Sequence, residues 1–219
     1  MQHRPMSCEG CPLHTTSTLG FCPDKIPSNA EYLLLAEAPG KNEIAQAEPM
    51  VGQAGFVLKQ WLMPAAIPLK IAYEKGKVGF ANVLRCLPKE VQGRAYPKGK
   101  DKQEAERLCR QYDSWPSTIH TVILFGEYSQ RLHFGPELEA EDQTDKRLGH
   151  DLKGVTGRIG RVYERDGKRW VFAPHPAFVL RQPALVRHGQ RALAIACGTE
   201  KIMEPVYAPW ETTLELRNA

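Results

Sequence analysis

The chain has 219 residues, of which 42% are hydrophobic and 25% are charged. These proportions are close to the averages for soluble globular proteins and exclude gross disorder, and the length fits one ordinary domain. The formal net charge of +4 permits a polyanionic partner but is too small to indicate one by itself. The sequence shows no run of about 18 apolar residues and no apolar signal-peptide core at its start, so we expect a cytoplasmic protein without a membrane segment.

Three apolar runs predict buried strands. The clearest run extends from Tyr32 to Ala36 within residues 31–37, and two further short segments occupy residues 78–84 and 121–126. Unbroken apolar runs are typical of parallel strands that are buried on both faces. Apolar residues at helical spacing predict helices over residues 53–63 and 102–115, each followed by a proline. Strands that alternate with helices indicate a βαβ arrangement.

The last third of the chain has a more varied pattern. Residues 135–154 are polar and charged without a core-forming pattern, so we expect a surface excursion there. Residues 161–163 and 170–173 flank Asp166-Gly167, a dipeptide favoured in tight hairpin turns, and predict two paired strands. Short helices are expected over residues 177–180 and 190–196. We assign residues 1–200 to one domain and residues 201–219 to a C-terminal tail without a recognisable pattern.

Six cysteines in a chain expected to be cytoplasmic indicate metal ligands or buried thiols rather than disulfides. Four of them are candidate ligands: Cys8, Cys11, Cys86 and Cys109. The first two form a CxxC pair in an irregular segment, the third ends a predicted strand, and the fourth lies in a predicted helix. Four thiolates suit structural zinc as well as an iron–sulfur cluster, and the wide separation of the last two modestly favours the cluster. An alternative interpretation treats the last two as small buried apolar residues.

The other two cysteines, Cys22 and Cys197, are interpreted as structural thiols. Cys22 is close enough in sequence to the CxxC pair to compete as a ligand.

Six short motifs follow one another between residues 8 and 197. They are Cys8-x-x-Cys11, Ala36-Glu37-Ala38-Pro39-Gly40-x-x-Glu43, Val51-Gly52-Gln53-Ala54-Gly55, Asn82-Val83-Leu84-Arg85-Cys86-x-Pro88, Cys109 and His175-Pro176-Ala177. In this order they resemble family 4 of the uracil-DNA glycosylase superfamily. The resemblance implies a single three-layer α/β/α domain with a central, mainly parallel sheet and a DNA groove at the strand ends. It also implies a 4Fe-4S cluster held by the four candidate cysteines.

The resemblance further implies a monofunctional glycosylase that removes uracil from DNA in base excision repair by hydrolysing the N-glycosidic bond. The target nucleotide must first be extruded from the duplex. His175 is then expected to donate to the uracil O2 position, where negative charge develops. Asn82 is expected to pair with the O4 and N3-H edge and so to reject cytosine. Glu43 is expected to act on the attacking water or within a hydrogen-bond network.

Further residues are expected around the base and the DNA backbone. The base-binding set is Glu37, Ala38, Met50 and Asn82, with Glu37 acting mainly through its backbone. The DNA-binding set is Gly40, Gly52, Gly55, Arg181 and Arg187, with Val179 or Leu180 as a wedge in the vacated base stack. For the glycines and arginines, turn geometry and a solvated surface position are the competing interpretations.

Met50 departs from the phenylalanine that is usual in the family, and methionine fills a pocket differently because it is flexible. With the long segment after Cys86, this departure leaves a second hypothesis open, a glycosylase for another modified or deaminated base, for example in foreign DNA. A third hypothesis is a non-catalytic DNA-binding relative. DNA is the expected partner, and we expect a monomer.

Overall fold

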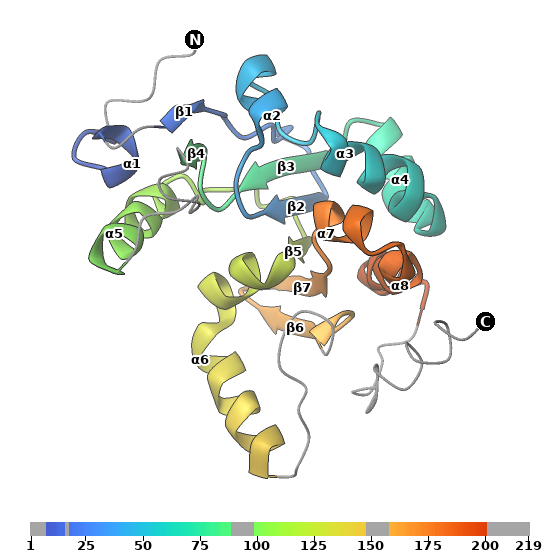
Figure 1. Ribbon diagram of the computed structural model, residues 1–219. Coiled ribbons are helices and arrows are strands. Elements are labelled where there is room, and N and C mark those ends of the chain that lie inside the picture. The colour runs from blue at the N-terminus through green and yellow to red at the C-terminus, as the bar shows by residue number, and fades with distance from the viewer. Residues whose placement is uncertain (1–7, 16–17, 89–98, 148–157, 201–219) are drawn as a thin grey trace.

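The structure is a computed structural model that describes residues 8–15, 18–88, 99–147 and 158–200. Its centre is a five-stranded sheet in the order β3-β2-β5-β7-β6 (Figure 1). The strands are β2 (Tyr32–Ala36), β3 (Val78–Asn82), β5 (Thr121–Phe125), β6 (Val162–Arg165) and β7 (Lys168–Ala173). The first three and β7 run parallel, and only β6, at one edge, pairs antiparallel to its neighbour. The predicted α/β class with a mainly parallel sheet is confirmed.

Burial explains the unbroken apolar runs. Every residue of β2, β3 and β5 is buried, because helices cover both faces of the sheet. The register places Asn82 beside Ala36 and Ala173 beside Phe125, so these four strands end together along one edge. That edge, formed by the carboxyl ends of the parallel strands, is where open α/β folds usually bind ligands.

One face of the sheet packs against the helices drawn at the top and right of Figure 1. They are α3 (Gln53–Val57), the π-helical turn η2 (Leu58–Leu62), the 3-10 turn η3 (Met63–Ala65), α4 (Ile67–Glu74), α7 (Pro176–Arg181), the 3-10 turn η5 (Pro183–Leu185) and α8 (Val186–Ala196). Their apolar side chains bury those of Leu34, Phe80 and Ile123. The helix predicted over residues 53–63 thus consists of α3, a π-helical turn and the start of a 3-10 turn.

The opposite face packs against α6 (Gly126–Arg147), seen at the lower left of Figure 1. Residues 135–147, predicted as part of a surface excursion, are helical; Leu138 is buried, whereas most of residues 135–140 are exposed, and residues 148–154 lie outside the described residues. The helix kinks at Phe134, and the side chains of Phe134 and Leu138, both on this helix, are buried against the sheet. With so few inward-facing apolar side chains, the sequence carries too weak a helical period to be recognised.

A smaller lobe lies beyond β3 and contains α1 (Pro12–Thr15), β1 (Thr18–Phe21), β4 (Cys86–Pro88) and α5 (Gly99–Arg110) (Figure 1). Strands β1 and β4 pair antiparallel. Cys86 therefore begins β4 instead of ending the strand predicted over residues 78–84. The helix predicted over 102–115 starts earlier and ends at Arg110, five residues before the predicted end.

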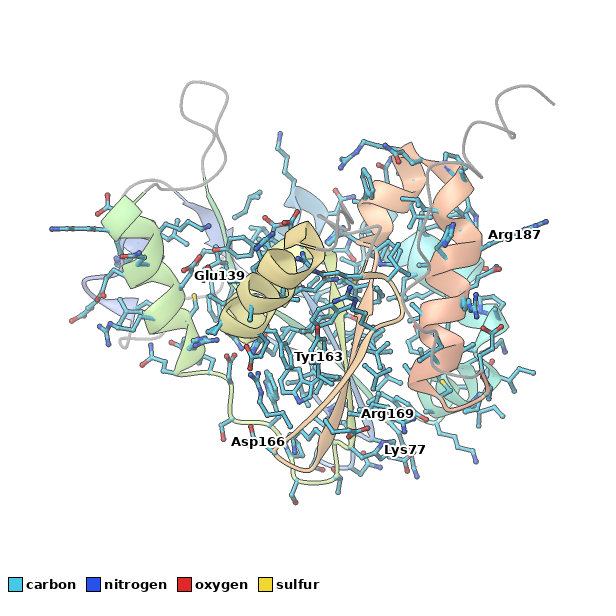
Figure 2. All side chains as sticks on the ribbon, turned by 90° about the horizontal axis from the view of Figure 1, so that it is seen from below. Lys77, Glu139, Tyr163, Asp166, Arg169 and Arg187 are labelled. Atoms are coloured by element: carbon cyan, nitrogen blue, oxygen red, sulfur yellow. The ribbon has the colours of Figure 1, made fainter. Side chains whose placement is uncertain are left out.

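The predicted hairpin between residues 161 and 173 is confirmed by the pairing of β6 with β7. Asp166 and Gly167 both have positive φ angles, +55° and +69°, as a type I′ turn requires. Figure 2 shows Asp166 at the hairpin tip, with Lys77 and Arg169 at the same end of the molecule. Because Lys77 precedes β3 and Arg169 lies at the start of β7, this end is the amino edge of the sheet, opposite the edge that carries the candidate site.

In the part of the chain that the structure describes, no helix has the length and apolar character needed to cross a bilayer. The tail over residues 201–219 lies outside the described residues.

Candidate functional site

Asn82 and His175 lie at the same edge and on the same face of the sheet. Asn82 is the last residue of β3 and is buried, and His175 follows the end of β7 by two residues. Alternation along the strand places Asn82 on the face of Phe80, and this is also the face to which Ala173 belongs. Strands β2 and β5 run between them, so the two polar side chains flank the central strand ends.

The imidazole of His175 is held as a neutral donor. His175 caps the start of α7, and its Nδ1 accepts a hydrogen bond from the backbone N–H of Ala177 at 3.2 Å. A neutral imidazole that accepts through Nδ1 carries its proton on Nε2. Burial, with a smaller effect from the charge of Arg181, lowers the pKa of His175 from 6.5 to about 4. The Nε2–H group therefore remains a donor at neutral pH.

Glu43 ties two loops of the site together. Its carboxylate accepts a hydrogen bond from the backbone N–H of Gly40, at the start of α2 (Lys41–Gln46), and another from that of Met50 at 2.5 Å. The side chain is buried, so these two bonds fix its position. Because both oxygens accept from backbone groups, the geometry favours the network role of Glu43 over action on water.

Met50 is buried and has a left-handed backbone conformation with φ of +58°. Three neighbours hold it there. Its N–H donates to Glu43, its carbonyl accepts from Nζ of Lys59 at 3.1 Å, and its carbonyl oxygen lies 1.9 Å from where a Cβ on Gly55 would stand. No other residue fits at position 55 without moving this loop, so close packing explains Gly55. Its predicted DNA contact stays a prediction.

The other predicted DNA-binding residues occupy helix starts or the surface. Gly40 and Gly52 cap the starts of α2 and α3. Arg181 and Arg187 are exposed, and Figure 2 shows Arg187 pointing away from the protein. Of the two proposed wedge residues, Val179 is fully buried in the core and is not available to enter DNA, whereas Leu180 is only partly buried.

The remaining base-binding candidates adjoin the smaller lobe. The carbonyl of Glu37 accepts a hydrogen bond from the N–H of Leu84 at 3.0 Å. Ala38 is half-buried against the apolar cluster that contains three cysteines. The loop after β2 thus lies between the sheet edge and the cysteines.

Three of the four candidate ligands, Cys11, Cys86 and Cys109, share one buried cluster. Cys8 is also buried, and Cys8 and Cys11 both contribute to the electrostatic environment of Cys109. Burial chiefly raises the pKa of the Cys109 thiol to about 11. None of these cysteines forms a disulfide. Within the described ranges, no three His, Cys, Asp or Glu side chains are arranged as ligands of a single metal ion.

The other two cysteines have different surroundings. Cys22 is fully buried, and its Sγ donates to the carbonyl of Pro23 at 3.6 Å. Burial, together with the negative charges of nearby carboxylates, raises the pKa of Cys22 to about 12. Cys197 is half-buried and hydrogen-bonds with Tyr32.

The sequence interpretation missed four residues that support the site: Asp24, Lys59, Arg85 and Gly126. Gly126 entered the sequence prediction only as the last residue of the run 121–126, although it lies against His175. Arg85 stands inside an apolar segment, directly before Cys86, and an arginine in such surroundings is the signal that was available.

The fold and the site together define an α/β protein whose binding edge carries an amide and a neutral imidazole. Residues 23–195 match the family model of the uracil DNA glycosylase superfamily. The type-4 uracil-DNA glycosylase of Archaeoglobus fulgidus is 31% identical over 82% of this chain and 81% of its own length. Those of Pyrobaculum aerophilum and Sulfurisphaera tokodaii are each 27% identical, over 91% and 82% of this chain and 93% and 74% of their own lengths. The chain belongs to the uracil DNA glycosylase superfamily.

Proposed function

We propose that the protein is a monofunctional glycosylase that excises uracil from DNA by hydrolysing the N-glycosidic bond, the first step of base excision repair. The observation that carries the proposal is the state of His175, a neutral imidazole whose Nδ1 is occupied by a backbone donor. Family membership and the names of the relatives support the same substrate.

The chemistry follows from where charge develops. As the glycosidic bond breaks, the departing uracil gains negative charge at O2, and a preorganised donor stabilises that charge most effectively where water is excluded. Nε2–H of His175 supplies this donor. With a pKa of about 4, the imidazole stabilises the anion by a hydrogen bond and does not transfer a full proton at neutral pH.

Asn82 reads the opposite side of the base. Its carboxamide offers one donor and one acceptor, which match O4 and N3–H of uracil, whereas the amino group of cytosine would face the amide donor. Glu43 fixes Gly40 and Met50 around the base, with Glu37 and Ala38 beside them. Gly40, Gly52, Arg181 and Arg187 are assigned to the DNA backbone, which is the expected partner of a cytoplasmic, monomeric repair enzyme.

We propose further that Cys8, Cys11, Cys86 and Cys109 hold a 4Fe-4S cluster. The donor set fits this group, because the four thiols are buried, are free of disulfides and belong to one lobe. Held by these four cysteines, such a cluster would link the segment before α1 to β4 and α5. Brown protein with broad visible absorbance and about four irons per chain is expected. Colourless protein with stoichiometric zinc would assign the site to zinc.

The test uses duplex and single-stranded oligonucleotides with one uracil, treated with alkali to cut abasic sites. Cleavage by the native protein is expected, with a large loss in His175→Ala. His120→Ala is the matched control, because His120 precedes β5 at the opposite edge, where its Nδ1 pairs with Thr121 Oγ1. Equal cleavage by native protein and His175→Ala would remove the role given to His175. DNA binding without any cleavage by native protein would favour a non-catalytic relative.

A second candidate function rests on Met50. In place of a rigid aromatic ring, a flexible thioether at this buried position favours a pocket that accepts another modified or deaminated base. The same assay with hypoxanthine, xanthine and hydroxymethylated cytosine tests it. Faster removal of any of these bases than of uracil would establish the second candidate.

A further inference from the structure

Arg85 is a fully buried arginine between the cysteine lobe and the sheet. Its side chain is only 1% exposed, although arginine is seldom buried unless it is paired. It is paired on several sides, and its hydrogen bonds lead in two directions.

One direction leads to the cysteines. Nη1 of Arg85 donates to the carbonyl of Cys109 at 2.8 Å, and the backbone N–H of Arg85 donates to the Cys109 sulfur. The guanidinium also lies 5.3 Å from the ring centre of Tyr112, whose hydroxyl is 3.3 Å from Sγ of Cys8. Arg85 is thus in contact with one candidate ligand and, through Tyr112, linked to a second.

The other direction leads to Asn82, the residue proposed to recognise the base. Nη2 and Nε of Arg85 donate hydrogen bonds to the carboxylate of Asp24 at 2.7 and 3.1 Å. The same carboxylate is held beside the end of β3, because the backbone of Lys25 exchanges two hydrogen bonds with that of Phe80 at 2.9 Å, and the backbone N–H of Asn82 is directed at it. A continuous path of hydrogen bonds therefore runs from Cys109 through Arg85 and Asp24 to Asn82.

A second carboxylate, Asp113, accepts from Nη2 of Arg85 at 3.1 Å. Asp113 follows α5, close to Cys109 in the chain, and Arg85 is the partner that links it to the path. The exposed fractions of Asp24 and Asp113 are similar, 16% and 20%, and both accept from Nη2 of Arg85, although Asp24 also accepts from Nε. Only Asp24 accepts from Asn82 in the hydrogen bonds described above.

We infer that Arg85 is a positioning residue that couples the four-cysteine site to Asn82, so that an intact metal site keeps the base-reading amide in place. Arg85 is a buried cation that hydrogen-bonds to Cys109 on one side and to Asp24 on the other. Loss of either set of bonds would leave a buried charge unsatisfied, so both partners are held rigidly. The inference rests on the proposed function for its catalytic readout, and its structural readout is independent of activity.

The first experiment compares Asp24→Asn with Asp113→Asn in metal-loaded protein. Asp24→Asn is expected to reduce kcat for uracil excision about tenfold with little change in KM for DNA, because the carboxamide keeps one oxygen that can accept from Arg85 but no longer offers a second oxygen to the N–H of Asn82. Its rate of iron release to a ferrous chelator should stay within about twofold of native protein. Asp113→Asn should leave kcat within about twofold of native protein, while its iron release becomes faster. Equal losses of kcat in both variants would overturn the coupling.

Arg85→Lys joins the comparison because it keeps the positive charge but cannot span Cys109 and Asp24 together. It is expected to show both defects at once, slower excision and faster iron release. Thermal melts identify any variant that has failed to fold. An Arg85→Lys protein that folds but shows only one of the two defects would contradict a path through Arg85.

The second experiment measures deuterium exchange in the peptide over residues 80–86. Removal of iron from native protein should raise exchange there, and Asp24→Asn should already show raised exchange while its metal is bound. Unchanged exchange in both cases would overturn the inference even if uracil excision occurs. Raised exchange in protein that cuts no uracil would support the coupling while the proposed function fails.

Discussion

Gly126 lies directly against His175. A Cβ added at position 126 would stand 3.2 Å from Cβ of His175 and 3.6 Å from Cδ2 of its ring. Gly126 also has a φ of +82°, which glycine adopts without strain. Gly126, which follows β5 and begins α6, thereby sets how closely the imidazole approaches the centre of the sheet edge.

Gly126→Ala is expected to displace His175 and to lower kcat by about tenfold to a hundredfold, as small displacements of a positioned group do. Gly76→Ala is the matched control, because Gly76 also has a positive φ, +68°, and no atom lies within 4 Å of an added Cβ. Both variants should lose about 1 to 2 kcal/mol of folding free energy in chemical denaturation. Equal kcat values in the two variants would show that Gly126 does not position His175.

The lowered pKa of His175 predicts the pH dependence of excision. Since the pKa lies near 4 in the folded protein, the imidazole stays neutral down to about pH 5, and single-turnover rates should be level from about pH 8 to that point. They should fall as the pH approaches 4. A rate that instead falls through pH 6.5 would indicate an imidazole with an ordinary pKa.

The same shift affects stability. Because the folded pKa lies below the ordinary value of 6.5, the unfolded chain binds the proton more readily between about pH 6.5 and 4. The free energy of unfolding should therefore decrease as the pH falls through this window. In His175→Gln, the free energy of unfolding measured by urea titration should fall less between pH 7 and pH 5 than in native protein. Part of the fall should remain, because burial also lowers the pKa of His133, to about 3.

Glu43→Gln should destabilise the protein and slow excision, because a carboxamide has one acceptor oxygen for the two backbone N–H groups of Gly40 and Met50. Its amino group would face the second donor. We expect a loss of about 1 to 3 kcal/mol in denaturant titrations. The control is Glu48→Gln, where an exposed pair with Lys25 should contribute at most about 1 kcal/mol. Native stability in Glu43→Gln would be inconsistent with the proposed link between the loops.

Met50→Phe should shift the base preference towards uracil, because a rigid ring stacks on a flat pyrimidine and fills the pocket more completely than a thioether. The measurement is the ratio of kcat/KM for uracil to that for hydroxymethylated cytosine. Met63→Phe is the control, since Met63 is equally buried but belongs to the core under η3. Overpacking should cost each variant about 1 to 3 kcal/mol. An identical ratio in both variants would place Met50 outside the base pocket.

The sequence predicted the parts of the molecule that depend on local pattern. The apolar runs at β2, β3 and β5 identified buried parallel strands, because burial on both faces favours apolar side chains along nearly the whole strand. The expectation that Asn82 and His175 belong to one site came from the family resemblance, and the common end of the parallel strands explains their placement at one edge. No helix was predicted between Gly126 and Arg147, since charged residues interrupt the apolar positions that contact the core.

Only the tertiary structure revealed how the site is supported. Arg85 and Asp24 are 61 residues apart, and no periodicity in the sequence signals a buried ion pair between them. Two other contacts likewise depend on how separate loops pack at the sheet edge. They are the contact of Gly126 with His175 and the hydrogen bond from the N–H of Met50 to Glu43. Local sequence determines which segments become strands and helices, because their burial pattern is periodic. The partners of a desolvated charge or a close-packed glycine are determined by the three-dimensional arrangement, because those contacts follow no period.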